Sequence, residues 1–288
     1  MVHACIRTNA RSHRMLLIDV TPPSLPRLAI RQCSERGLRY SSKWAAEQLV
    51  GLRSAQAIHD QEMAFVSGAA NESGDESDEE ADIVLLAKAY FDVNEFLRAA
   101  HVLRGARSAH GRFIRWYALF LAGEKRKDER MLEENGGSFT AVPAGKPRAI
   151  NEQLAILQME LQKEGAAGRL DAFGQYVYGL ALRELQRTRD AAAAFREAAN
   201  LCPCFWSAWL ELAATLPNVD AVDSLDLPNH WMVSFFRAHA ALEAQHNVQA
   251  IRMYEELLTA FPDSPYLQCQ LAHARYNLRE VGHVFRSN

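Results

Sequence analysis

The strongest constraint on the fold is a spaced pattern that occurs twice. A small residue, an aromatic, a further apolar residue and a proline follow one another with the same spacing: Ala191, Phe195, Ala198 and Pro203, then Ala250, Tyr254, Leu257 and Pro262. An apolar stretch with a small residue precedes each set, Gly179 and Ala238 respectively. Small residues allow close helix packing, and proline ends a helix because it lacks an N–H and clashes with the preceding turn. The pattern predicts repeated pairs of helices.

This spacing is the signature of the tetratricopeptide (TPR) repeat, a helix-turn-helix unit of about 34 residues. The two matches lie closer together than two whole periods. We attribute this to Pro217 and Pro228, which leave room between them for a second helix of at most a turn or two. The predicted fold class is all-α, a TPR-like helical-hairpin solenoid with a disordered N-terminal arm and an acidic linker.

The chain divides by composition into six segments. Pro22, Pro23 and Pro26 predict a disordered arm over residues 1–27. Residues 28–66 predict N-terminal helices with a break at Gly37 and an N-cap at Ser41 or Ser42. Residues 67–82 predict a disordered acidic linker, because dense negative charge without large apolar side chains cannot form a core.

Helical periodicity resumes in residues 83–135, which predict TPR-like helices. The expected faces are Ile83, Leu86, Ala87 and Tyr90, then Ala99, Ala100 and Leu103, then Ile114, Tyr117, Ala118 and Leu121. The mixed charges around Lys125, Arg126 and Lys127 predict a solvated turn between helices. Glycines and prolines predict a loop over residues 136–150.

Residues 151–288 predict a TPR array that is incomplete at its C-terminus. It opens with a stripe of Leu154, Leu157 and Leu161. The final hairpin is expected to have a first helix from Pro265 to Leu278 but no second helix to cover it. A group of apolar side chains there is expected to be partly uncovered: Leu271, Ala274, Leu278, Val281 and Phe285.

Charge and cysteine content limit the possible partners. The net charge of −3 disfavours a nucleic-acid partner, and no apolar run approaches the length of a membrane span, so we expect neither nucleic acid nor membrane as a partner. The five cysteines are expected to be free thiols, with Cys202 and Cys204 buried beside Pro203.

Two Glu-x-x-His pairs need a separate interpretation, Glu243 with His246 and Glu280 with His283. Such pairs can build a di-iron site in a four-helix bundle, but that site also needs further inward glutamates. The repeat alignment places both pairs in turns between helices. We therefore expect no metal, no cofactor and no catalytic residue, and the motifs of common enzyme classes are absent from the sequence.

Several strings outside the repeat consensus are similar to one family. They are Glu35 to Leu38, Ser41 to Glu47, Leu86 to Val93, Arg98 to His101, Gly123 to Asp128, Leu170 to Gly174, Trp206 to Leu212 and Leu227 to Met232. In this order they resemble the cell division cycle protein twenty-three family of anaphase-promoting complex subunits, over roughly residues 30 to 285.

The resemblance implies a non-catalytic scaffold in a multi-subunit ubiquitin ligase that controls mitosis. It implies other TPR and scaffold subunits as partners, a homodimer formed through the N-terminal half, and a location in nucleus and cytoplasm. Trp44 and Leu49 are the expected dimer residues. Family members are about twice as long, so the chain is expected to represent the N-terminal half, without the C-terminal repeats that receive activator tails.

Two other function classes remain as alternatives. A TPR co-chaperone or adaptor would bind acidic peptide tails through lysines and arginines on its first helices, but residues 172–182 and 206–216 are mostly apolar. An enzyme fused to TPR repeats ranks third, because no remaining segment is long enough for a catalytic domain. The chain has many aromatic residues, most of which are expected to pack between helices rather than line a peptide-binding groove: Trp116, Tyr117, Tyr176, Tyr178, Trp206, Trp209, Trp231, Phe235 and Phe236. Thr21, Ser73 and Ser77 are expected to be exposed hydroxyls at which phosphate could add charge.

Overall fold

The computed structural model describes residues 24–52, 76–134, 149–217 and 219–284. Every regular element in these ranges is helical, which confirms the all-α prediction. The chain forms two compact units, residues 1–150 and 151–288. Thr21, Ser73 and nearly all of the predicted loop 136–150 lie outside the described residues.

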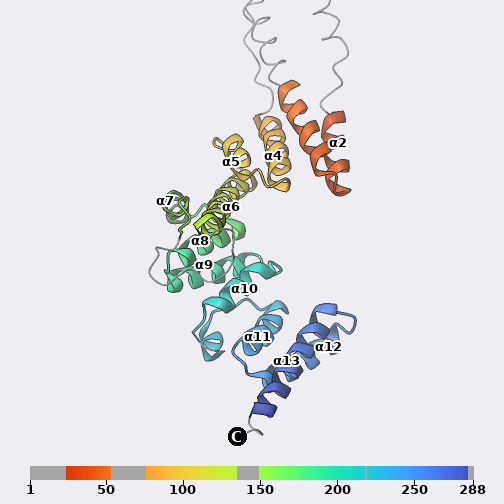
Figure 1. Ribbon diagram of the computed structural model, residues 1–288, viewed down its shortest axis with the longest axis vertical. Helices are drawn as coiled ribbons and strands as arrows, with labels where there is room; N and C mark the ends of the chain where they lie inside the picture. The colour runs from red at the N-terminus through yellow and green to blue at the C-terminus, as the bar shows by residue number, and fades with distance from the viewer. Residues whose placement is uncertain (1–23, 53–75, 135–148, 218, 285–288) are drawn as a thin grey trace, which may run out of the picture. The chain divides into compact units, whose positions relative to one another are not determined.

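Unit 1 consists of successive helices (Figure 1). They are α2 (Ser24–Glu35), a helix over residues 39–52, α4 (Glu76–Asp92), α5 (Phe96–Val102) and α6 (Ala109–Glu134). Gly37 has φ +73° in the turn after α2, as its predicted role as a break requires. Helix 39–52 begins at Arg39, so the prediction of an N-cap at Ser41 or Ser42 is wrong. Ser42 is buried, and its hydroxyl donates to the Ile30 carbonyl at 3.2 Å.

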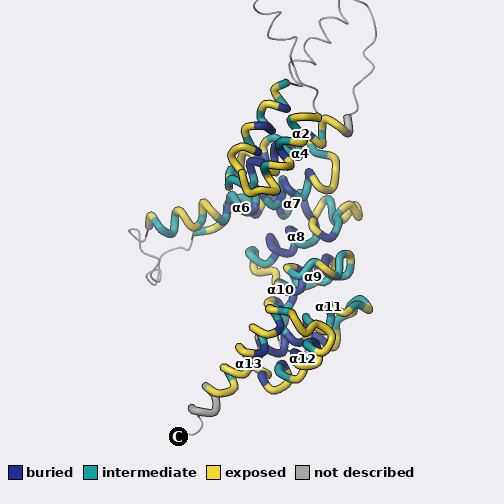
Figure 2. Tube along the Cα trace, turned by 90° about the vertical axis from the view of Figure 1, so that its right-hand side faces the viewer, coloured by how far each residue is buried: buried dark blue, intermediate teal, exposed yellow. Residues whose placement is uncertain are grey.

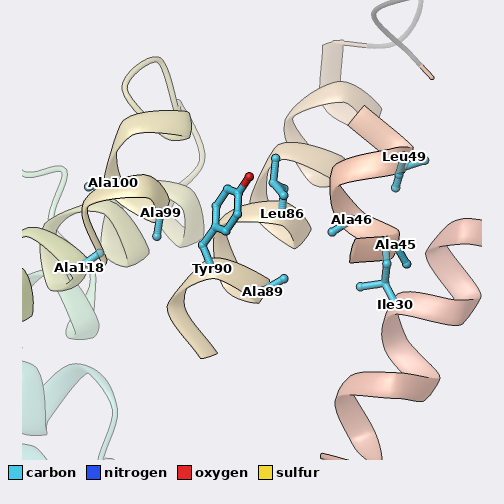
Figure 3. Close-up of a cluster of buried hydrophobic side chains, with 10 residues drawn as sticks. All are labelled: Ile30, Ala45, Ala46, Leu49, Leu86, Ala89, Tyr90, Ala99, Ala100 and Ala118. Atoms are coloured by element: carbon cyan, nitrogen blue, oxygen red, sulfur yellow. The ribbon is translucent and has the colours of Figure 1, made fainter. Parts of the chain in front are cut away.

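The core of unit 1 joins its five described helices. Figure 3 shows Ile30 of α2 beside Ala45 of helix 39–52, with Leu86 and Tyr90 projecting from α4. The remaining members of this cluster are Ala46, Leu49, Ala89, Ala99, Ala100 and Ala118. The abundance of alanine allows close approach of the helices, and the predicted faces of α4 and α5 are confirmed by the burial of these residues.

The predicted disorder is wrong at two boundaries. α2 begins at Ser24 and contains Pro26, which a helix tolerates in its first turn. α4 begins at Glu76, inside the predicted acidic linker. Asp82 is buried, and its carboxylate accepts a hydrogen bond of 2.6 Å from Nε of Arg27, which also pairs with Asp78 at 2.9 Å. The positive charge of Arg27 thus offsets part of the negative charge from which disorder was predicted.

The predicted turn at Lys125 to Lys127 is also wrong. These residues lie inside α6, which continues to Glu134. Lys127 pairs with Glu124 one turn earlier, and such pairs support a helix on an exposed surface. The mixed charges mark a solvated helix face, not a connection.

Unit 2 contains the TPR hairpins (Figure 1). Its elements are α7 (Leu154–Ala166), α8 (Ala172–Glu184), α9 (Thr188–Leu201), α10 (Trp206–Thr215), the 3₁₀ helix η1 (Val219–Ser224), α11 (Met232–Glu243), α12 (Asn247–Ala260) and α13 (Pro265–Val284). α8 packs on α9 and α11 packs on α12, as the repeat pattern predicts. The short η1 occupies the predicted place between Pro217 and Pro228.

The repeat residues have the packing roles that the pattern predicts. Phe195 and Tyr254 are fully buried, and so are Ala191 and Ala250. A Cβ added at Gly179 would lie 2.5 Å from the Phe195 ring, so the lack of a side chain at Gly179 allows the close approach of α8 to α9. The Trp209 indole N–H donates to the Pro203 carbonyl at 2.8 Å and fixes the next helix to the end of the repeat.

Candidate interaction surfaces

The outer face of helix 39–52 is an exposed aromatic surface. Tyr40 is 77% exposed and Trp44 is 65% exposed, and the two lie one helical turn apart. Ala45, Ala46 and Leu49 lie on the opposite face in the core. Trp44 is therefore available to a partner, as predicted, whereas Leu49 is fully buried and cannot be a dimer residue. Tyr40 is a member of this surface that was not predicted, although its spacing of four from Trp44 indicates a shared helical face.

A polar network fixes helix 39–52 against α4 and α5. Tyr90 of α4 donates to Glu47 at 2.9 Å and accepts from Arg98 at 2.8 Å. Arg98 also pairs with Glu47 at 3.1 Å and Glu95 at 2.6 Å, and its guanidinium lies 4.1 Å from the centre of the Tyr90 ring. Lys43 pairs with Glu95. The network sets the orientation of the Tyr40 and Trp44 surface.

The electrostatics of this network follow from burial and pairing. Burial, reinforced by the hydrogen bond to Glu47, raises the pKa of Tyr90 to about 12, so its hydroxyl remains protonated. The hydrogen bond from Lys43 lowers the pKa of Glu95. The lowered pKa keeps Glu95 charged opposite Lys43 at neutral pH. Such an arrangement stabilises the contact of helix 39–52 with α4 and α5.

The aromatic residues of unit 2 serve mainly in packing, as predicted. Trp209 and Phe236 are fully buried, with ring centroids 5.0 Å apart. Trp206, Phe235 and Trp231 are less buried and belong to a series of ring contacts across α10, α11 and α13. Trp231 is 49% exposed.

The last helix is covered at its start and exposed toward its end (Figure 2). Leu271 and Ala274 are buried against α12, so the prediction that they are uncovered is wrong. Leu278 is 42% exposed, as predicted, and contributes to a groove of about 770 Å³ beside Asn247 and Met253 of α12. Val281 and Phe285 have side chains outside the described residues.

In the described part of the chain, the candidate metal ligands and thiols do not form a site. His246 lies in the turn between α11 and α12, as predicted. The backbone at Glu280 and His283 is helical within α13, so the predicted turn there is wrong. Among described residues, no three His, Cys, Asp or Glu side chains gather as metal ligands would. Cys202 is half-buried and Cys204 is exposed, contrary to the prediction that both are buried.

No described helix has the length and apolar character needed to cross a membrane.

The two hairpins of unit 2 each bury a small residue and an aromatic ring between their helices and end at a proline, and this arrangement defines a TPR-type protein. Residues 26–272 match the family described as Anaphase promoting complex subunit 8 / Cdc23. The chain therefore belongs to this family, and the resemblance found in the sequence is confirmed.

Two relatives show the extent of the similarity. Anaphase-promoting complex subunit 8 of Arabidopsis thaliana is 38% identical over 285 residues, covering 90% of this chain and 48% of the relative. Cell division cycle protein 23 homolog of Homo sapiens is 37% identical over 248 residues, covering 86% of this chain and 39% of the relative. The chain thus spans less than half the length of these relatives.

The solved structure titled "Crystal structure of APC/C hetero-tetramer Cut9-Hcn1" aligns with 90% of this chain and 51% of its own. The TM-score is 0.45 and the sequence identity is 12%, which is too weak to support a conclusion.

Proposed function

We propose that this chain is a non-catalytic scaffold of the anaphase-promoting complex, which holds other subunits of that ubiquitin ligase through its TPR hairpins. The observation that carries the proposal is the family match over residues 26–272, together with the hairpin packing of unit 2. The matched family and the relative from Arabidopsis thaliana are both named as subunit 8 of that complex. The proposed location is the nucleus and cytoplasm, which fluorescence microscopy of the tagged chain tests.

The test of this function is affinity purification of the tagged chain from its own cells at native expression, followed by mass spectrometry. Recovery of several other subunits of the complex is the expected result. Recovery of the chain without them, under conditions in which a second tagged subunit recovers the complex, contradicts the proposal. Measured ubiquitin transfer by the purified chain alone contradicts the non-catalytic part.

We further propose that the chain forms a homodimer through Tyr40 and Trp44 of helix 39–52. These two side chains form an exposed aromatic surface on a helix that the polar network holds firmly, and aromatic residues of this kind are frequent in interface cores. Replacement of both by serine is expected to convert the dimer to monomer in light scattering. Met159→Ser is the matched control, because Met159 is 73% exposed on α7. A monomeric parent chain, or a double variant that still dimerises, contradicts this interface.

The peptide-clamp alternative has less support from the structure. A clamp for acidic tails needs unpaired basic residues on the first helices of the hairpins. Arg183 of α8 is instead paired with Glu211 of α10 and with Glu184. Its charge is already neutralised within unit 2.

A further inference from the structure

The groove of about 770 Å³ in unit 2 lies along α12, beside α13. It is lined by residues 245–249, which form the end of the turn and the start of α12, and by Leu278 of α13. Further lining residues follow along α12 and are introduced below where they bear on its chemistry. We call this surface the α12 groove. Because residues 245–249 line it, the groove opens onto the N-terminus of α12, whose first residue is Asn247.

The start of α12 presents backbone N–H groups that have no acceptor. His246, the N-cap residue, makes no side-chain hydrogen bond to the helix, and the first turn contains no acidic side chain. The N–H groups of a first helical turn have no intrahelical acceptor. Those of Asn247, Val248 and Gln249 also donate to no other carbonyl in the described part of the chain. Such N–H groups, together with the helix dipole, attract anions.

The side chain of Asn247 is a second, independent indication of a ligand. Asn247 is only 5% exposed and lines the groove, and its Oδ1 has no hydrogen-bond partner among the described residues. Native proteins leave few buried polar groups unpaired, because each costs about 1–3 kcal/mol. Half a turn of the amide exchanges Oδ1 and the NH2 group, so the same position can donate to an anion. The amide thus adds a donor to the free N–H groups of the helix.

Arg252 gives the groove a positive charge one turn after Val248. It is exposed and makes no hydrogen bond or ion pair with the described residues. Glu256 is the one acidic residue that lines the groove, and it lies a further turn away from the start of the helix. A guanidinium beside several free N–H groups is suited to phosphate, which offers several acceptor oxygens and pairs with arginine through two parallel hydrogen bonds.

We propose that the α12 groove binds a phosphate group carried by a side chain of a partner polypeptide. The phosphate oxygens accept from the N–H groups at the start of α12, from the turned amide of Asn247 and from Arg252. Residues beside the phosphorylated one contact Val248, Met253 and Leu278, of which Val248 is 53% and Leu278 is 42% exposed. This apolar surface favours a polypeptide over free phosphate. The proposal concerns unit 2 alone and does not depend on assembly of the ligase.

The test uses the whole chain in NMR titrations that follow the backbone N–H signals of Val248 and Gln249 and the side-chain amide of Asn247. The probe is a phosphoserine flanked by two leucines, acetylated and amidated at its ends, and its counterparts are the unphosphorylated peptide and inorganic phosphate. We expect saturable shifts with the phosphopeptide, binding at least tenfold weaker with inorganic phosphate, and no binding of the unphosphorylated peptide. Equal binding of inorganic phosphate overturns the polypeptide source, and equal binding of the unphosphorylated peptide overturns the phosphate site.

Substitutions separate this site from a general attraction of phosphate to positive charge. Arg252→Gln should weaken binding about tenfold, and Asn247→Asp should abolish it, because it places a carboxylate of the same shape beside the phosphate. Glu256→Gln should strengthen binding several-fold, because it removes the one carboxylate that lines the groove. Arg189→Gln, which alters an exposed arginine of α9 outside the groove, is the matched control and should leave the affinity unchanged. Full affinity of Arg252→Gln, or an equal loss in Arg189→Gln, overturns the proposal; circular dichroism verifies that each variant is folded.

Discussion

Replacement of Gly179 by alanine tests whether close contact between α8 and α9 holds the repeat together. The added Cβ would lie 2.5 Å from Cε1, 2.6 Å from Cδ1 and 2.8 Å from Cζ of Phe195. Phe195 is fully buried and its ring also contacts Tyr176, with centroids 6.0 Å apart, so it has little room to rotate. The two helices must separate to accept the methyl group.

The size of the effect follows from two opposing contributions. Overpacking of a close-packed core costs about 1–3 kcal/mol, whereas alanine favours a helix interior over glycine by about 1 kcal/mol. Because the added Cβ would lie under 3.0 Å from three ring atoms, the overpacking cost should fall in the upper part of its range, about 2–3 kcal/mol. The net loss should then be about 1–2 kcal/mol, which lowers the Tm by roughly 2–8 °C for a domain of this size. The second repeat has Ala238 at the matching place, facing Tyr254, so a hairpin can accept a Cβ there and the loss should not unfold the chain.

Thermal unfolding followed by circular dichroism measures this loss. Gly51→Ala is the matched control, because no atom lies within 4 Å of its added Cβ and the change should stabilise helix 39–52. Phe195→Leu, introduced together with Gly179→Ala, should be less damaging than the sum of the two single changes, since a smaller side chain relieves the overlap. If Gly179→Ala is as stable as the parent and the two changes are additive, the packing argument is refuted.

Three further predictions concern helix ends and charge. Asp171→Ala removes the carboxylate that accepts from the Gly174 N–H at 2.8 Å, and should destabilise unit 2 by about 1 kcal/mol in denaturant unfolding, whereas Asp171→Ser should retain most of the stability. Gln245 has φ +62°, so Gln245→Gly should stabilise the chain by roughly 0.5–1 kcal/mol, and a loss of stability would contradict strain at this turn. Pairing with Lys43 lowers the pKa of Glu95, so this pair stabilises the folded chain fully above the unfolded pKa of about 4.3. That stabilisation is lost as the pH falls through the lower pKa of the folded state. Hydrogen exchange in helix 39–52 should accelerate in that acidic range, and Glu95→Gln should show no such step.

The repeat core could be predicted from the sequence because its determinants are local. Gly179, Phe195 and Pro203 each have a role fixed by helix geometry, and their spacing alone places α8 against α9. The boundaries at Ser24 and Glu76 could not be predicted in this way. These boundaries depend on the hydrogen bond between Arg27 and Asp82, which lie 55 positions apart. The local charge of the acidic stretch indicates only the repulsion among its own carboxylates.

The candidate surfaces were predicted only in part for a similar reason. Trp44 and Leu49 both fit an apolar helical pattern, but their burial depends on the rotation of helix 39–52 about its axis. The hydrogen bond from Ser42 to Ile30 and the contacts of Lys43 and Glu47 set that rotation. These partners lie on other helices, so the sequence pattern does not distinguish the buried face from the exposed one.

Turn geometry extends the repeat beyond the segments that match its consensus. Asn94, Gln186 and Gln245 have φ of 62°, 60° and 62°, and each lies between the two helices of a hairpin. In all three turns the following residue donates to a carbonyl five positions earlier, at 2.9 Å: Glu95 to Tyr90, Arg187 to Leu182 and His246 to Ala241. Because side chains other than glycine are disfavoured in this region, the same backbone conformation at three sites indicates a common requirement of the hairpin. The α4–α5 pair of unit 1 therefore closes with the same turn as the two hairpins of unit 2, although it lacks their aromatic and proline pattern.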